Sequence, residues 1–150
     1  MKIELKNIKY AAFASHDSHC YTATLYVDGQ KLCQVSDDGY GGEPSYHGIR
    51  GGVSQQDVYK RISEIDSLDI ACCDLLNDWL RKRDFKKQMK KITLISDGNV
   101  QFYKALAPTP ENIALVKASP DWNKDDLLLN EMPEGEAFKL FVEATTPKNI

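Results

Sequence analysis

The three histidines of the chain, His16, His19 and His47, all lie in its first third. In HDSHC the pair His-x-x-His is followed by Cys20, and imidazole and thiolate groups are zinc ligands. The spacing lacks the paired Cys-x-x-Cys of well-defined zinc sites, so we assign no metal ligand. A histidine oriented by a carboxylate is also a common general base. A third interpretation is that these histidines are polar surface residues, and the residues alone leave these alternatives open.

A glycine-rich stretch, SDDGYGGEPSYHGIRGG, runs from Ser36 to Gly52 and holds six of the nine glycines. Glycine lets the backbone approach a ligand closely, and consecutive amides can bind an anion. The spacing matches neither a dinucleotide fingerprint nor a P-loop. The stretch is therefore either a connector or a ligand-binding loop. If it binds a ligand, the candidate residues are His19, Asp38, Gly39, Gly41, Gly42, Tyr46, His47 and Arg50.

The strand pattern predicts that these two segments are neighbours. CYTATLYV is rich in β-branched and aromatic residues, and Asp28-Gly29 then predicts a two-residue hairpin turn. The resulting register pairs Val27 with Gln30, Leu25 with Leu32, Ala23 with Gln34, Cys20 with Asp37 and His19 with Asp38. Alternation puts Tyr21, Ala23, Leu25, Val27 and Leu32 on the core face, and Cys33 and Val35 on the other face with Cys20. If the protein is an enzyme, His19, Asp38 and His47 are its catalytic candidates, but no nucleophile is well placed.

The remaining segments complete an α+β pattern. Ser54 and Asp57 predict a helix start, and a second helix is expected from Asp69 to about Lys90. Asp97-Gly98 predicts a second hairpin, which pairs Ile95 with Val100 and Thr93 with Phe102. Thr109-Pro110 and Pro133 each predict a helix start, and Leu127–Leu129 a final strand.

We therefore expect a single α+β domain over residues 1–150, with a hairpin-rich antiparallel sheet packed with two to four helices. Residues 1–52 form its β-rich part with the glycine-rich loop, residues 53–91 are helical, and residues 92–150 form a hairpin and short helices.

A basic run, RKRDFKKQMKK, extends from Arg81 to Lys91 and holds seven of the nineteen Lys and Arg residues. Such a helical face can follow phosphates, but only Phe85 interrupts it as an aromatic residue. The solvated half of a long helix is the favoured interpretation, and nucleic-acid binding ranks below the other functions.

The overall composition is that of an ordinary protein domain. Apolar residues make up 42 % and charged residues 27 % of the chain, and the formal net charge is −3. We expect a cytoplasmic protein, because no apolar run is long enough for a membrane span and the N-terminus lacks a signal-peptide core. The four cysteines are expected to be free thiols, and no cofactor is indicated.

Three stretches together resemble a known group of proteins: IELKNIKYAAFAS, the segment SHC with YTATLYVDGQK, and LLLNEMPEGEAFKLF. They are similar to small proteins of unassigned function that bacteriophages and prophages encode. The resemblance carries no catalytic motif, so it implies no site residues.

A phage origin implies a role in the host cytoplasm, where small accessory proteins often block host defence. We therefore expect a non-enzymatic binding protein that inhibits anti-phage defence, either by occluding a host defence protein or by capturing a nucleotide-type small molecule. A homo-oligomer is compatible with this role. The first alternative is a small hydrolase or nucleotide-modifying enzyme with a His/Asp site, and the second is nucleic-acid binding through residues 81–91.

Overall fold

A computed structural model describes residues 1–102 and 106–146, and its contacts divide the chain into two compact units, Met1–Asp78 and Trp79–Ile150. The sequence alone suggests one domain, whereas each unit has a hydrophobic core of its own. The α+β class is confirmed, because the described residues form four α-helices and two antiparallel sheets. In these same ranges no helix has the length and apolar character that crossing a membrane requires.

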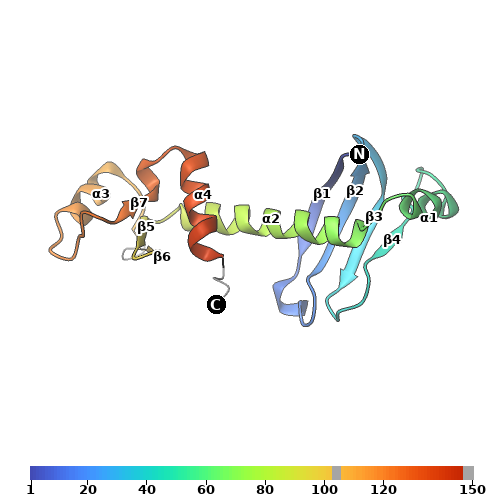
Figure 1. Ribbon diagram of the computed structural model, residues 1–150, viewed down its shortest axis with the longest axis horizontal. Coiled ribbons are helices and arrows are strands. Elements are labelled where there is room, and N and C mark those ends of the chain that lie inside the picture. Colours follow the sequence, from blue (N-terminus) through green and yellow to red (C-terminus); the bar gives the residue numbers. More distant parts are fainter. Residues whose placement is uncertain (103–105, 147–150) are drawn as a thin grey trace. The chain divides into compact units, whose positions relative to one another are not determined.

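The first unit is a four-stranded antiparallel sheet in the order β1-β2-β3-β4, with two helices on one of its faces (Figure 1). Its elements are β1 (Ile3–Tyr10), the short 3-10 helix η1 (Ala12–Ala14), β2 (Cys20–Val27), β3 (Gln30–Asp38), β4 (Ser45–His47), α1 (Gln55–Ser63) and the first part of α2 (Leu68–Gln88). The predicted Asp28-Gly29 turn is confirmed, with φ of 50° at Asp28 and 81° at Gly29.

The predicted register of this hairpin is correct only next to the turn. Val27 pairs with Gln30, but beyond an irregularity at Leu25/Tyr26 the partners shift by one residue. Leu25 pairs with Cys33, Ala23 with Val35, Tyr21 with Asp37 and Cys20 with Asp38. The cause is a β-bulge, which inserts one extra residue, at Leu32, into β3. The expected pairing of Cys20 with Asp37 and of His19 with Asp38 is therefore wrong.

The bulge also changes which residues of β3 are buried. Cys33 and Val35 were expected on the outer face, yet both are fully buried on the core side beside Leu25. The predicted core face of β2 is confirmed, because Tyr21, Ala23, Leu25 and Val27 are all buried. Across this core lie Val58 of α1 and Cys72 of α2. The first unit thus holds one face of its sheet under two helices. On the other face, the side chains of β2 are half-buried.

Local capping signals fix the first helix. The Ser54 hydroxyl accepts a hydrogen bond from the Asp57 N–H at 3.2 Å, as the sequence predicts for a helix N-cap. The side chain of Gln55 then donates to the Tyr46 carbonyl at 2.9 Å, which ties α1 to β4.

The second unit packs a small sheet, in the order β6-β5-β7, between helices. It contains the second part of α2, β5 (Thr93–Ser96), β6 (Asn99–Phe102), α3 (Pro110–Lys117), β7 (Leu127–Leu128), the 3-10 helix η2 (Leu129–Glu131) and α4 (Glu134–Thr145). The predicted pairs of the second hairpin, Ile95 with Val100 and Thr93 with Phe102, are confirmed.

Both faces of β5 are buried, because successive side chains of a strand point to opposite sides. Ile95 packs with Phe85 of α2 and Phe141 of α4, whereas Leu94 packs with Val116 of α3. The predicted long helix is also confirmed, since α2 is continuous and its second half is covered around Phe85.

Candidate functional site

The β1–β2 loop and the glycine-rich loop are tied together through Gly39. Its carbonyl accepts backbone hydrogen bonds from His16, Asp17 and Ser18, at 3.0, 2.8 and 3.2 Å. Gly39 is buried and has a φ of 84°, and a Cβ at this position would lie 2.1 Å from the carbonyl oxygen of Ala14. Only glycine combines this conformation with so close an approach of two backbones. The expected proximity of the two loops is therefore confirmed, although the register differs.

A second connection between these loops involves Asp37 and Ser18. The Asp37 carboxylate accepts from the Ser18 hydroxyl at 2.9 Å and from the Gly39 N–H at 2.8 Å. The Ser18 hydroxyl in turn accepts from the Gly41 N–H at 3.1 Å. The two bonds of the Ser18 hydroxyl cross from one loop to the other, so the pair of loops forms one ordered surface.

His19 is held by two uncharged partners rather than by a carboxylate. Its Nε2 lies 2.9 Å from Asn77 Oδ1, and its Nδ1 lies 3.4 Å from the Tyr10 hydroxyl. Because an amide oxygen only accepts, His19 Nε2–H donates to Asn77, while the Tyr10 hydroxyl can donate to Nδ1 or accept from it. In the described part of the chain, no hydrogen bond joins His19 to a carboxylate or to a thiol.

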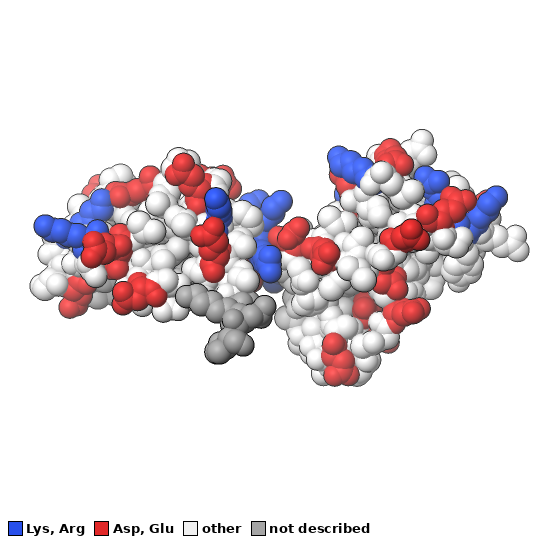
Figure 2. Space-filling model, in the orientation of Figure 1, with Lys and Arg blue, Asp and Glu red and all other residues white. Residues whose placement is uncertain are grey.

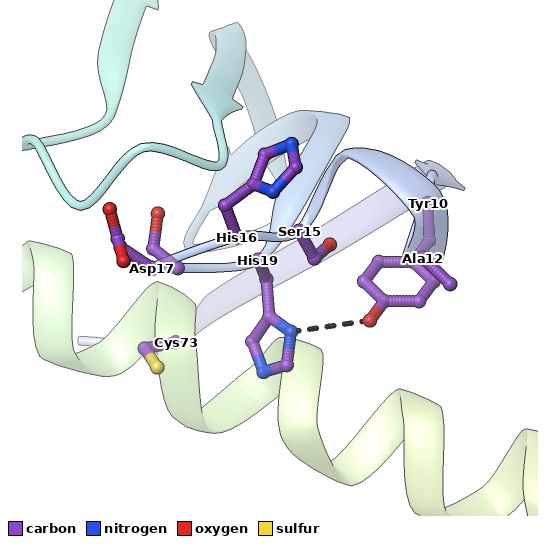
Figure 3. A pocket seen from close by; sticks show the side chains of 8 residues that line it. Tyr10, Ala12, Ser15, His16, Asp17, His19 and Cys73 are labelled. Atoms are coloured by element: carbon purple, nitrogen blue, oxygen red, sulfur yellow. Dashed lines mark hydrogen bonds between the residues drawn. The ribbon is translucent and has the colours of Figure 1, made fainter.

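These side chains border an open cavity of about 500 Å³ in the first unit. Its lining comes from the end of β1, the β1–β2 loop and α2, namely Tyr10, Ala12, Ser15, His16, Asp17, Ser18, His19 and Cys73. Figure 3 shows the Tyr10 hydroxyl and the His19 ring pointing toward each other, while the His16 ring points away from α2. The Cys73 thiol accepts from Asn77 Nδ2 at 3.6 Å.

The remaining residues of the candidate set lie apart from His19. Asp38 is exposed opposite Cys20, and its carboxylate accepts from the Tyr40 N–H at 3.1 Å. His47 is exposed and pairs with Gln34, in the middle of β3. Arg50 is exposed, and Gly42 has open space around it. The structure thus joins Gly39 and Gly41 to the residues that precede His19, but it does not form the proposed His19–Asp38 pair.

Three amides of the glycine-rich loop already have acceptors within the protein. The N–H groups of Gly39, Tyr40 and Gly41 already donate to Asp37, Asp38 and Ser18. Two of these acceptors are carboxylates, whose charge also repels a phosphate. These three amides are therefore not available to bind a phosphate.

Tyr46 is part of the core side of the unit rather than of the loop surface. Its hydroxyl donates to Asp69 at 2.5 Å, and it packs against the cluster that contains Cys72. Burial and this hydrogen bond raise the pKa of Tyr46 well above its ordinary value. Tyr46 therefore remains a neutral donor and fixes β4 to α2.

The adjacent cysteines of α2 differ in reactivity in a way that can be measured. Burial raises the pKa of the Cys72 thiol from 9.0 to about 11, whereas Cys73 is exposed. We expect iodoacetamide at pH 8 to alkylate Cys73 at least about tenfold faster than Cys72, as mass spectrometry of timed samples would report. Equal rates at the two positions would contradict the described packing of α2.

The same shift gives the first unit a pH dependence. Because the thiol of Cys72 binds its proton more tightly when folded, its contribution to stability is complete below pH 9 and is lost as the pH rises toward about 11.

The two ordered loops carry exposed aromatic side chains. Phe13 of η1 is 90 % exposed and Tyr40 is 67 % exposed. Tyr40 stacks on His16 with ring centroids 5.1 Å apart and an interplanar angle of 24°. We call Phe13, His16 and Tyr40 the aromatic loop surface.

Sequence reasoning missed Tyr10, Phe13, Tyr40 and Asn77. Phe13 had a usable signal, because it is a lone aromatic residue among alanines in AAFAS. Cys73 and Asn77 also share one face of a predicted helix by their spacing of four. The contact between Asn77 and His19 joins residues 58 positions apart, and no local pattern indicates it.

Comparison with known proteins gives no match to a family model, to a curated protein or to a solved structure. Within residues 1–102 and 106–146, no group of three His, Cys, Asp or Glu side chains is arranged to hold a metal ion.

Proposed function

We propose that this chain is a non-enzymatic binding protein that recognises a protein partner through its aromatic loop surface. The observation that supports this most directly is Phe13, whose side chain is 90 % exposed on a short 3-10 turn. Large aromatic side chains are enriched among the residues that dominate protein–protein affinity. Their exposure in an unbound protein is unfavourable, and a partner that covers them regains that free energy.

The backbone that carries these rings is already ordered. The Gly39 carbonyl binds three successive amides of the β1–β2 loop, and Ser18 links the two loops further. Tyr40 is held against His16 by stacking. A preorganised surface loses little conformational entropy on binding, which is the main cost that flexible loops incur.

The geometry around His19 favours binding over catalysis. A general base needs a free nitrogen directed at a substrate or nucleophile, and both ring nitrogens here face Asn77 and Tyr10. The cavity beside it is therefore better suited to receive part of a partner than to activate a nucleophile.

The negative charge around the aromatic loop surface indicates the chemistry of the partner. Asp17 and Asp38 are exposed beside the aromatic rings. A complementary surface would present an apolar pocket bordered by Lys or Arg side chains. On the resemblance to phage-encoded proteins, we propose that this partner is a host defence protein, which the chain inhibits by occlusion.

The test compares capture by three forms of the immobilised protein from a bacterial lysate. The first is the wild type, and the second is the double variant Phe13→Ser/Tyr40→Ser. The control is Tyr59→Ser/Ile70→Ser, which removes two side chains that are 60 % and 63 % exposed elsewhere in the first unit. We expect at least one protein to be retained by the wild type and the control and lost with the double variant.

Two outcomes would overturn the proposal. One is an identical set of retained proteins for all three forms. The other is a change of the native mass of the double variant in light scattering, because the surface would then join copies of this chain rather than a partner.

A further inference from the structure

A stripe of cations runs along one side of α2 in the second unit. The spacing of these cations places them on one helical face, which they share with Trp79. We call this set the basic stripe: Trp79, Lys82, Arg83, Lys86, Lys87 and Lys90. Lys90 lies in the turn just beyond the helix, and all five cations are exposed. Figure 2 shows Lys and Arg side chains over the C-terminal part of α2. Phe85 points instead into the core, with an exposure of 4 %.

The lysines of this stripe have no carboxylate partners. Within the described ranges Lys82, Lys86, Lys87 and Lys90 form no ion pair, although Lys117 of the same unit pairs with Glu131 at 2.8 Å. Like charges four positions apart, such as Lys82 and Lys86, destabilise a helix. Only the cations of the last turn benefit from the helix dipole. An external anion would relieve this repulsion.

Aromatic rings accompany the cations, which the sequence did not indicate. The Arg83 guanidinium lies over the Trp79 ring at 5.4 Å from its centroid, and Lys91 lies over Phe102 at 5.1 Å. Phe102 is 52 % exposed. Cations beside flat rings are the combination with which proteins follow a single strand, because phosphates contact the cations and bases stack on the rings.

A cavity of about 370 Å³ opens beside the stripe. Lys82 and Lys86 line it together with Glu134, and Phe85 and Phe138 supply its apolar surface. An unstacked base has an apolar face and polar edges, and a carboxylate can accept from its amino group. A base paired within a duplex could not enter, so the cavity favours a single strand.

We propose that the basic stripe, with Phe102 and this cavity, binds single-stranded nucleic acid. The lysines neutralise successive phosphates, and Trp79 or the cavity receives a base. The proposal concerns the second unit alone and does not depend on the partner proposed for the first unit.

The test uses fluorescence anisotropy with a labelled oligodeoxythymidine of about 20 nucleotides, long enough for one binding site. The variant Lys82→Gln/Lys86→Gln is compared with Lys124→Gln/Lys139→Gln, which removes the same charge from exposed positions outside the stripe. We expect the stripe variant to lose about tenfold in affinity at about 50 mM salt and its salt slope to decrease by about 1.4, while the control stays near the wild type.

Trp79 separates nucleic-acid binding from simple attraction of anions. Trp79→Leu should lower the affinity for the oligonucleotide by about fivefold, whereas Trp79→Phe should retain most of the wild-type affinity. Neither change should affect binding of inorganic polyphosphate. Absence of binding at low salt, equal losses in the stripe and control variants, or an unchanged affinity of Trp79→Leu would each overturn the proposal.

Discussion

Replacing Gly39 by alanine should lower the free energy of unfolding by about 2–4 kcal/mol. The added Cβ would lie 2.1 Å from the Ala14 carbonyl oxygen and 3.0 Å from the Cys20 Cβ, and the φ of 84° disfavours any side chain. The β1–β2 loop would have to move, and its three hydrogen bonds to the Gly39 carbonyl would weaken. Urea denaturation of the purified variant measures the loss.

Gly29→Ala is the matched control for this substitution. Gly29 has nearly the same φ, 81°, but a Cβ there would meet nothing within 4 Å. Gly29→Ala should therefore lower the free energy of unfolding by only about 1 kcal/mol, which is the cost of a side chain at this φ. If the two variants lose the same stability, the close contact between the loops is not as described.

Truncation of Phe85 to alanine should destabilise the second unit by about 3–5 kcal/mol. Phe85 is 4 % exposed, and its ring packs against Phe138 and Phe141, with centroids 5.3 and 5.4 Å away. The smaller side chain would lose these contacts and leave a cavity between α2 and α4. Native-state hydrogen exchange should then show faster exchange of the amides of β5 and α4.

Leu115→Ala provides the comparison for Phe85 in the same unit. Leu115 is 67 % exposed on α3, so its truncation should change stability by less than about 0.5 kcal/mol. Unchanged protection of β5 and α4 in Phe85→Ala would show that Phe85 is not the centre of this core.

The turns and helix starts that the sequence predicted well depend on residues that are adjacent in the chain. The Asp-Gly turns need a positive φ that Asp and Gly accept, and both hairpins form where this pair occurs. The helix starts at Ser54 and Thr109 follow from hydroxyl groups that cap the nearby amides.

The features that sequence did not predict depend on packing between distant segments. The bulge at Leu32 moves Cys33 and Val35 into the core, where their burial outweighs the regular pairing that a two-residue turn would give. The division into two units likewise follows from which residues α2 contacts along its length, which helical periodicity does not specify.

The sequence predicted the proximity of the β1–β2 loop and the glycine-rich loop, but not the contacts made there. Strand alternation and the Asp28-Gly29 turn were sufficient to predict that the β1–β2 loop lies beside the glycine-rich loop. They could not indicate that His19 would bind Asn77, because that contact requires the placement of α2 on the sheet. Nor could they show that Asp37 and Asp38 would occupy the loop amides.

The most direct test of the aromatic loop surface is site-specific photocrosslinking in bacterial cells. A benzophenone amino acid would replace Phe13 in one form and Tyr59, which is 60 % exposed on α1, in another. The account predicts a crosslink to one host protein from position 13 and none to that protein from position 59. The same products from both positions, or a crosslink only to a second copy of this chain, would contradict it.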